Sequence, residues 1–479
     1  MSIEKRRISS EVIEKLIQEK KYQEIRSLFD IYPEIDIAEA CNNLEDKSQL
    51  ITIFRVVKSE HTAELFCYLS QETQEMLVKL MTDKDVTALL DASSNDDIVD
   101  FLEDMPANLV KKILQNSSKE DRAIINKLLN YKEDSAGSIM TTEFLEFLNT
   151  LTVKDTIQKV REIGKDAETI YTIFVKDNKR NFMGTVDLDD LIFAEPEQKL
   201  EDIMNVDFVT VDVNTDQEQV AQLVRRYDLN AIAVLNDDKR LVGIITVDDI
   251  VDVIQQEANE DLSLQAGVNP MDDSYKNTGV FKMAMKCIPW LVVLLVIDVL
   301  SSIVISGFQA QIASVAVLSA FIPTIMDTGG NSGSQTSSVM VRSIALNEFS
   351  NKDFWKVLWK ETRISLIVAA ITSIFAWCWF MIEMYLHLVT YNGPSGETLV
   401  GWDLFIARSG IALLVASTLF ITILISKFFG FLLPWFAKLI KKDPALMSGP
   451  LITSIVDVSS LLIYFGVFEI IKLGFGINF

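Results

Sequence analysis

Residues 290–308, WLVVLLVIDVLSSIVISGF, decide the architecture of this chain, because they contain a single charged side chain in 19 residues. A helix that crosses a bilayer needs about 20 predominantly apolar residues. Comparable apolar stretches occur at 312–330 (running on towards 340), 364–388, 404–426 and 448–471. The sequence therefore predicts a C-terminal α-helical membrane domain of five spans, over residues 285–479.

The charge of the 479-residue chain is concentrated before this domain. The 67 acidic and 44 basic residues give a net charge of −23, yet from Cys287 onward acidic and basic residues balance at 11 each. Residues 1–286 therefore form an acidic, soluble part. A nucleic-acid-binding protein is excluded because it would need a basic face. No nucleophile–base pair or phosphate-cradling loop stands out, so we expect no enzyme.

The connections between the predicted spans give their orientation. Residues 342–363 hold five basic side chains and residues 427–442 hold four, whereas residues 307–311 and 385–403 hold none. Basic loops stay on the cytoplasmic side, so five spans with a cytoplasmic N-terminus fit every loop. No apolar run follows the first basic residues, so no signal peptide is expected. We expect a multi-pass plasma-membrane protein with cytoplasmic N-terminal domains.

Residues 1–132 predict an all-α, superhelical domain of short helices. Apolar residues recur at three- and four-residue intervals, as in NLVKKILQNSSKEDRAIINKLLN at 108–130. Ser70, Ser94 and Ser118 recur every 24 residues, each before acidic or amide residues. A serine in such a place caps the next helix. A helical scaffold without chemistry of its own is the simplest interpretation of this domain.

Residues 133–256 contain two similar α/β units. Each combines an amphipathic helix, two strands joined by a polar turn, and a helix that opens on an Asp-Asp pair. The corresponding positions are Met140 and Met204, Gly184 and Gly243, and Asp190 and Asp249. This arrangement resembles a tandem pair of cystathionine-β-synthase-type (CBS) domains, modules that commonly sense nucleotides or ions.

The last predicted span begins DPALMSGPLITSIVDVSSLLIYF, with Asp457 near the bilayer midplane. A carboxylate at this depth costs on the order of 2.5–3.5 kcal/mol, so it should face a water-filled path or a partner. Thr453, Ser454 and Ser460 stand near it at helical spacing and add small oxygen donors. The alternative is a carboxyl group that only bonds a neighbouring helix.

The second predicted span contains FIPTIMDTGGNSGSQTSSVMVRSIALNE. Pro323 removes a helical donor and the following glycines loosen the backbone, which predicts a broken helix beside protein or water. Asp327, Asn331 and Gln335 supply oxygen atoms for a pore wall. Small residues also serve ordinary helix packing, and that alternative stays open. Asp298 in the first span is left without a role.

A third group is formed by carboxylates on the second α/β unit and the helix that leaves it. They are Asp216, Glu218, Asp228, Asp248, Asp249, Asp252, Glu257, Glu260 and Asp261, with Asp272 and Asp273 next. With two histidines and no paired cysteine spacing, any metal ligands here are oxygens, which favours Mg²⁺ or Ca²⁺. Such a density of charge is neutralised by a divalent cation, or else it forms a solvated acidic face.

Three motifs together resemble those of the MgtE family of magnesium channels. They are P-x₅-G-G-N-x-G-x-Q at Pro323–Gln335, the VRSIALNE that follows, and DPALxSGP-x₆-D at Asp443–Asp457. The order of domains is similar along essentially the whole chain. The resemblance implies a homodimer in the lipid membrane, with spans two and five lining a pore on the two-fold axis. Asp457 of each subunit would hold Mg²⁺ that keeps its inner waters.

The resemblance also implies a set of cytosolic Mg²⁺-sensing ligands. Carried over position by position, they are Asp96, Asp100, Asp216, Glu218, Asp228, Asp249, Asp252, Glu257, Glu260 and Asp261. A connecting helix at 257–284 would contain a plug beneath the pore, around 262–283. Family members also bind ATP in the CBS pair, but Asp189 stands here where a basic residue is expected beside Asp190, which speaks against ATP.

The expected function is a Mg²⁺-selective uptake channel that cytosolic Mg²⁺ closes by binding the acidic domains. Such feedback requires Mg²⁺ to bind the closed form better than the open form. A coupled transporter or exporter of divalent cations is the nearest alternative. A membrane receptor whose CBS pair signals to a partner, without transport, is the more distant one.

Overall fold

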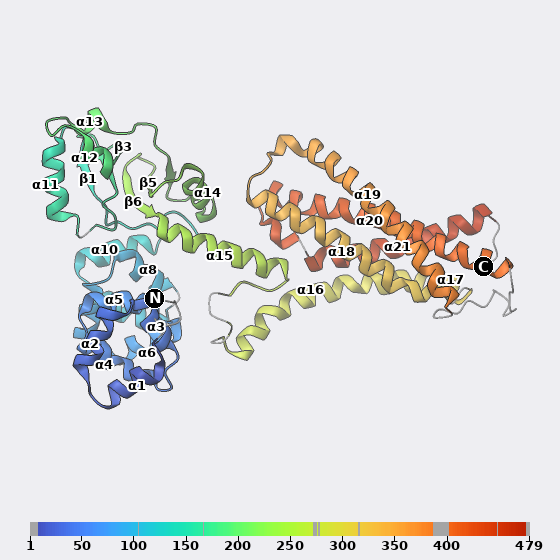
Figure 1. Ribbon diagram of the computed structural model, residues 1–479, viewed down its shortest axis with the longest axis horizontal. Helices are drawn as coiled ribbons and strands as arrows, with labels where there is room; N and C mark the ends of the chain where they lie inside the picture. The colour runs from blue at the N-terminus through green and yellow to red at the C-terminus, as the bar shows by residue number, and fades with distance from the viewer. Residues whose placement is uncertain are drawn as a thin grey trace. The chain divides into compact units, whose positions relative to one another are not determined.

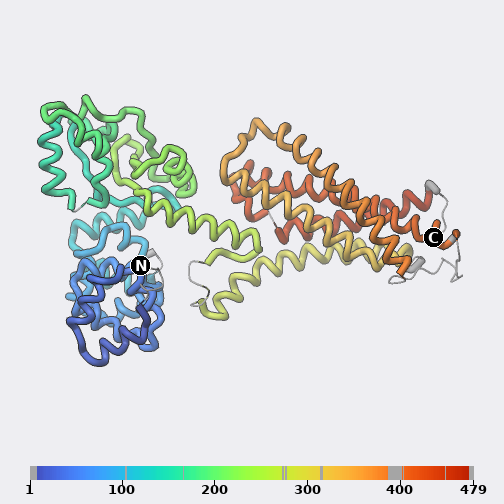
Figure 2. The backbone as a smooth tube through the Cα atoms, in the orientation of Figure 1, coloured from blue at the N-terminus to red at the C-terminus, as the bar shows by residue number. Residues whose placement is uncertain are grey.

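The computed structural model describes residues 8–475, apart from residues 104, 166, 272–274, 276–277, 315–316, 387–401 and 448. The chain forms two compact units, residues 1–256 and residues 257–479 (Figure 1). Figure 2 traces the backbone of the first unit from blue into green and that of the second from yellow to red. His387, Asp272 and Asp273 lie outside the described residues.

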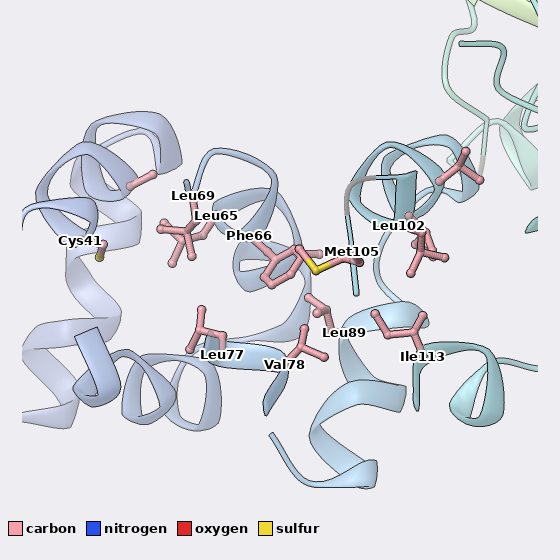
Figure 3. Close-up of a cluster of buried hydrophobic side chains, with 14 of the residues drawn as sticks. Cys41, Leu65, Phe66, Leu69, Leu77, Val78, Leu89, Leu102, Met105 and Ile113 are labelled. Atoms are coloured by element: carbon pink, nitrogen blue, oxygen red, sulfur yellow. The ribbon is translucent and has the colours of Figure 1, made fainter. Parts of the chain in front are cut away.

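The first unit begins with ten short α-helices in the part of the chain that the structure describes. They are α1 (Ser10–Gln18), α2 (Tyr22–Ile31), α3 (Glu34–Asn42), α4 (Leu50–Val56), α5 (Ser59–Cys67), α6 (Gln71–Leu80), α7 (Asp83–Leu90), α8 (Asn95–Glu103), α9 (Ala107–Asn116) and α10 (Lys119–Leu128). Their apolar faces meet in a common core, in which Leu65, Leu77 and Val78 are wholly buried (Figure 3). The predicted stack of short helices is confirmed.

The three serines with a 24-residue spacing precede α6, α8 and α10, as the capping argument predicts. The Ser118 hydroxyl accepts a hydrogen bond from the backbone N–H of Asp121 at 3.0 Å. The Ser94 hydroxyl lies 3.4 Å from the corresponding N–H of Asp97. Ser70 instead pairs with the Thr73 hydroxyl at 2.8 Å, so it marks the helix start without capping it through its side chain.

Two three-stranded sheets follow, and their identical topology confirms the predicted CBS pair. The first repeat contains β1 (Glu146–Leu148), α11 (Val153–Ile163), β2 (Thr172–Lys176), β3 (Phe182–Asp187) and α12 (Leu188–Phe193). The second contains α13 (Leu200–Ile203), β4 (Thr210–Asp212), α14 (Gln217–Tyr227), β5 (Ala231–Leu235), β6 (Leu241–Thr246) and α15 (Val247–Gln265). In each sheet the first two strands are parallel and the last two antiparallel.

The two repeats exchange the segments that lead into them. Thr141, before β1, bridges to Ile244 in β6, and Asn205, before β4, bridges to Thr185 in β3. The glycines permit this crossing, because a Cβ on Gly243 would lie 2.5 Å from the Met140 sulfur. The second repeat also shares one buried core with the helical domain, whereas the first repeat has a core of its own. This packing brings α8 towards α15.

All the regular secondary structure in the described part of the second unit is helical. Its helices are α16 (Val280–Gly307), α17 (Gln309–Ser314), α18 (Leu318–Ala345), α19 (Phe354–Tyr385), α20 (Trp402–Leu439) and α21 (Gly449–Phe475). The helices α18, α20 and α21 pack together, with α19 along α20 (Figure 1). Among the residues that the structure describes, four segments are long and apolar enough to cross a bilayer: Val280–Gly307, Asn351–Tyr385, Leu404–Leu439 and Pro444–Leu473.

Helix α18 is the exception among the five predicted spans. Its 28 residues would extend about 42 Å, but its run of glycine, serine, threonine and amide residues keeps its apolar content low. The count of five spans therefore stays a prediction. The expected break in this helix is wrong: α18 is a continuous α-helix through Pro323 and the glycines.

The predicted plug helix around 262–283 is also wrong as a single helix. Helix α15 ends at Gln265, and α16 begins at Val280. Gly267 adopts a positive φ of 70°, a conformation that favours glycine after a helix end, and Pro270 follows three residues later. Gly267 and Pro270 therefore account for the end of α15, whereas the family resemblance implied that the helix continues.

Candidate ion pathway and acidic clusters

One face of α18 carries the predicted pathway residues. Pro323, Asp327, Asn331 and Gln335 are four residues apart, lie on one helical face and are all exposed. The Asn331 amide donates to a carboxylate oxygen of Asp327 at 3.1 Å. Since such polar side chains are expensive against lipid, this face requires water or another protein surface.

Asp457 lies on α21 beside this face. One of its carboxylate oxygens is buried and accepts no hydrogen bond from any described residue. The carboxylates of Asp327 and of Asp298, on α16, are close enough to act electrostatically on it. An oxygen that is buried and unpaired is costly, and a hydrated cation supplies the donors and the positive charge that it lacks.

Helix geometry places Asp298 and Asp457 at a common height in the bundle. Trp290 of α16 and Pro450 of α21 both lie against Gly267. Asp298 follows Trp290 by eight residues and Asp457 follows Pro450 by seven, which are rises of about 12 Å and about 10.5 Å. The residues next to Asp298 in the chain are all apolar or small, so no local pattern indicates a role for it.

The glycines of α18 serve close helix packing, the alternative that the sequence left open. A Cβ on Gly329 would lie 2.8 Å from Val456 of α21, and one on Gly330 would lie 2.8 Å from Thr453. A Cβ on Gly333 would lie 2.6 Å from the Ser426 hydroxyl of α20. Such small residues let helices approach closely in a membrane. They hold the polar face of α18 next to Asp457.

The three predicted hydroxyl residues of α21 do not share one environment. Thr453 lies against Gly330 and Ser334 of α18. The hydroxyl oxygens of Thr453 and Ser334 are 3.5 Å apart. Ser460 is wholly buried and donates to the backbone carbonyl of Asp457 at 2.9 Å. Ser454 is buried as well. All three pack in the helix bundle, and their part in the pathway stays a prediction.

In the first unit, the predicted ligands Asp96 and Asp249 come together where α8 approaches α15. Burial raises the pKa of Asp249 to about 6, and the Asp96 and Asp248 carboxylates add to this. Burial, followed by the charge of Asp97, raises the pKa of Asp96, and one oxygen of Asp96 is buried without a hydrogen bond from a described residue. Carboxylate oxygens are ligands that suit Mg²⁺.

Two glutamates that the sequence analysis missed belong to the same cluster. Burial raises the pKa of Glu168 to about 7, and the negative charges of Asp96 and Asp249 contribute to the shift. Burial and Asp96 also raise the pKa of Glu143, which accepts a hydrogen bond from the Asn95 amide at 3.1 Å. Both come from the first repeat, far from Asp249 in sequence, so no local pattern could have indicated them.

The remaining predicted ligands of the first unit are not gathered into one site. Asp216 caps the start of α14 and accepts from the Glu218 N–H at 3.0 Å, whereas Asp228 ends the same helix. The two carboxylates are about 18 Å apart along that helix. Asp100 lies one turn after Asp96 on α8, and Asp252 lies exposed one turn after Asp249 on α15.

A second carboxylate cluster lies at the start of the second unit. Burial raises the pKa of Asp261 to about 6, and the charges of Asp443 and Glu257 contribute. Burial also raises the pKa of Asp443. Glu260 lies on the same helix, α15. Asp443, just before α21, was quoted in the sequence only as part of a motif, and the fold adds it to the predicted ligands Glu257, Glu260 and Asp261.

The acidic residues at the start of α12 bear on ATP binding. Asp187, Asp189 and Asp190 are all exposed, with carboxylate oxygens within 4.8 Å of one another. A concentration of negative charge repels phosphate groups. That Asp189 disfavours ATP in this chain stays a prediction.

The fold defines the class of this protein: it is a multi-pass membrane protein with an acidic soluble part that contains a CBS pair. A family profile described as a divalent cation transporter, MgtE, matches residues 322–467. The MgtE intracellular N domain matches residues 32–134, and a CBS domain matches residues 200–256.

Similar proteins are known over almost the full length. The magnesium transporter MgtE of Bacillus subtilis is 31% identical over 452 residues, which are 94% of this chain and 95% of that one. The magnesium transporter MgtE of Thermus thermophilus is 29% identical over 460 residues, or 95% and 96% of the two chains. A crystal structure of the cytosolic domain of the Mg²⁺ channel MgtE in complex with ATP is 31% identical, with a TM-score of 0.48, and covers 51% of this chain and 99% of that chain.

The chain belongs to the MgtE family of magnesium transporters. Proteins of this family are named as transporters and not as enzymes.

Proposed function

We propose that this protein is a homodimeric Mg²⁺ channel for magnesium uptake, which Mg²⁺ on the cytoplasmic side closes. The observation that carries the proposal is the buried, unpaired carboxylate oxygen of Asp457 beside the polar face of α18. In a single chain this face is exposed although it lies on a helix of the membrane unit. A second copy related by a two-fold axis would enclose both faces around one path.

The ion pathway would hold Mg²⁺ with its inner waters retained. Asp457 from each subunit supplies charge, and Asp327, Asn331 and Gln335 supply oxygen atoms to those waters. Mg²⁺ gives up its water reluctantly, so contacts through water suit it better than a tight protein cage.

Closure would use the acidic clusters of the soluble part. At low cytosolic Mg²⁺ the carboxylates around Asp96 and Asp249 repel one another, and the channel is open. At high Mg²⁺ the bound ions bridge these groups and stabilise the closed state. The buried oxygen of Asp96 supports this assignment, because burial of an unpaired carboxylate is favourable only with a positive partner.

The substitution Asp457→Asn tests the pathway. In liposomes that contain a fluorescent Mg²⁺ indicator, we expect it to lower Mg²⁺ influx at least about tenfold, because the charge that holds the ion is removed. Glu348→Gln, at an exposed carboxylate after α18, is the matched control and should conduct like the unmodified protein. Wild-type flux through the Asp457 variant would refute the role of this residue.

A coupled divalent-cation transporter or exporter is the second candidate, because it too would use a carboxylate within the membrane. Mg²⁺ influx in liposomes without a Na⁺ or H⁺ gradient, together with single-channel currents, supports the channel. Influx that occurs only in fixed stoichiometry with a counter-ion supports coupling. If the unmodified protein passes no Mg²⁺ at all, both transport functions are wrong, and a membrane receptor whose CBS pair signals to a partner is the remaining interpretation.

A further inference from the structure

A buried ion pair lies behind α18, away from the pathway residues. Lys427 of α20 has a side chain that is only 6% exposed, and its ammonium lies 3.8 Å from the Glu361 carboxylate of α19. The Thr336 hydroxyl of α18 connects them: it accepts from Lys427 at 3.0 Å and donates to Glu361 at 2.9 Å. Three helices of the membrane unit therefore meet in one polar contact.

The pair is located within helices that cross the membrane. Lys427 lies 12 residues before the end of α20, and Glu361 lies seven residues after the start of α19. The pair lies just beyond the predicted apolar spans 364–388 and 404–426 and is buried among the helices, and a buried charge is unfavourable unless it is paired. Removing one partner of a buried pair leaves an uncompensated charge, which is worse than removing both.

Lys427 is held against the face of α18 that is opposite the pathway. Its neighbour Ser426 donates to the Gly329 carbonyl, and a Cβ on Gly430 would lie 2.4 Å from the Gly333 carbonyl oxygen. Gly329 follows Asp327 by two positions, and Gly333 follows Asn331 by two positions. Two positions correspond to a rotation of about 200° around a helix, so the glycines lie on the side opposite these pathway residues. The ammonium, which binds Thr336, therefore lies behind α18 and about 13.5 Å along the helix from the Asp327 position.

A cavity of about 190 Å³ adjoins the pair on the side of Glu361. Glu361, Thr362 and Ser365 line it together with apolar side chains of α19 and α20. At about 30 Å³ for each water molecule, it has room for about six. Glu361 therefore faces a space that can hold water, whereas Lys427 is enclosed by protein.

We propose that Glu361 neutralises Lys427, so that this fixed positive charge does not oppose Mg²⁺ in the pathway. The inference deepens the proposed channel function and rests on it. Glu361 and Lys427 are positioning residues, because neither touches the ion. Without Glu361, the ammonium would repel a divalent cation through a medium of low dielectric constant. Without Lys427, the remaining carboxylate faces the cavity and adds attraction.

The test compares three variants in the liposome assay: Glu361→Gln, Lys427→Met and the double variant. The charge mechanism predicts an asymmetry, in which Glu361→Gln lowers Mg²⁺ influx by roughly tenfold and raises the Mg²⁺ concentration for half-maximal flux. Lys427→Met should stay within about threefold of the unmodified protein, and the double variant should recover most of the lost flux. Equal losses in both single variants, with the double variant no better, would overturn the proposal in favour of a purely structural tether.

Three further variants separate the effect of charge from the effect of contact. Thr336→Val keeps both charges and removes the bridging hydroxyl, so its flux should stay within about twofold of the unmodified value. Lys356→Met, at an exposed lysine of α19, is the control for loss of a cation. If Glu361→Gln fails to assemble, Thr362→Lys adds a second ammonium to the cavity and should lower the flux in the same direction; unchanged flux there overturns the proposal.

The experiment distinguishes this inference from the proposed function. If the unmodified protein passes no Mg²⁺, the channel itself is wrong. If it conducts and Asp457→Asn does not, while Glu361→Gln conducts normally, only the role of the ion pair is wrong. Melting temperatures of all variants in detergent show which flux changes come from lost stability.

Discussion

At the residue scale, carboxylates decide where this protein meets cations. Asp457, Asp96 and Asp249 were predicted from the chain or from its resemblance to a family. In Asp457 and Asp96, one carboxylate oxygen is buried and accepts no hydrogen bond from a described residue. Glu143, Glu168 and Asp443 enter only through the fold. Each lies in a segment whose local sequence suggests no ligand, and each becomes relevant because tertiary packing places it beside another acid.

The raised pKa of Glu168, about 7, makes stability depend on pH. The folded protein binds a proton that the unfolded chain has already lost between about pH 4.5 and pH 7, so the free energy of unfolding falls as the pH rises through this window. In metal-free buffer, the melting temperature should therefore be lower at pH 8 than at pH 5.5. Glu168→Gln should flatten this dependence. A melting temperature that rises from pH 5.5 to pH 8 equally in both proteins would contradict the argument.

At the element scale, glycines determine how the membrane helices approach one another. The sequence left two interpretations of the glycine-rich segment open, a broken backbone or close packing, and α18 is an unbroken helix whose glycines contact α20 and α21. Composition could not separate the two, because both need residues without side chains. The contacts of the neighbouring helices decide it.

The substitution Gly430→Ala tests this packing. Its new methyl group would lie 2.4 Å from the Gly333 carbonyl oxygen, so backbone must shift, and we expect a loss of stability of about 1–3 kcal/mol. Gly466→Ala is the matched control, because nothing lies within 4 Å of that position. Alanine otherwise favours a helix over glycine by about 0.5–1 kcal/mol, so the control should melt at the same or a higher temperature. If both variants change the melting temperature in detergent equally, or if Gly430→Ala melts at the higher temperature, close packing at Gly430 is contradicted.

At the scale of the whole molecule, the chain combines a membrane unit with an acidic soluble unit. The helical domain shares a core with the second CBS repeat, and this common core is what joins Asp96 to Asp249. A ligand site made from two domains responds to their separation, which is the property that feedback by Mg²⁺ requires.

Limited proteolysis of the full chain tests this response. Mg²⁺ should slow cleavage of residues 1–256, because the ion stabilises the arrangement in which the carboxylates are close. Asp249→Asn should lose most of this protection, whereas Asp238→Asn, at an exposed acid in the turn before β6, should keep it. Full protection by Mg²⁺ in the Asp249 variant would remove this residue from the sensor.

The sequence by itself determined the division into an acidic and an apolar part, the duplication of the CBS fold and the position of Asp457 within a span. Charge, hydropathy and repeats are properties of adjacent or regularly spaced residues, so they can be found without a fold. Only the tertiary structure decided that α18 is continuous, that the helix after the CBS pair ends at Gln265, and that the two repeats exchange their leading segments. It alone brought Asp298 close to Asp457 and paired Lys427 with Glu361, because these contacts join helices that are far apart in the chain.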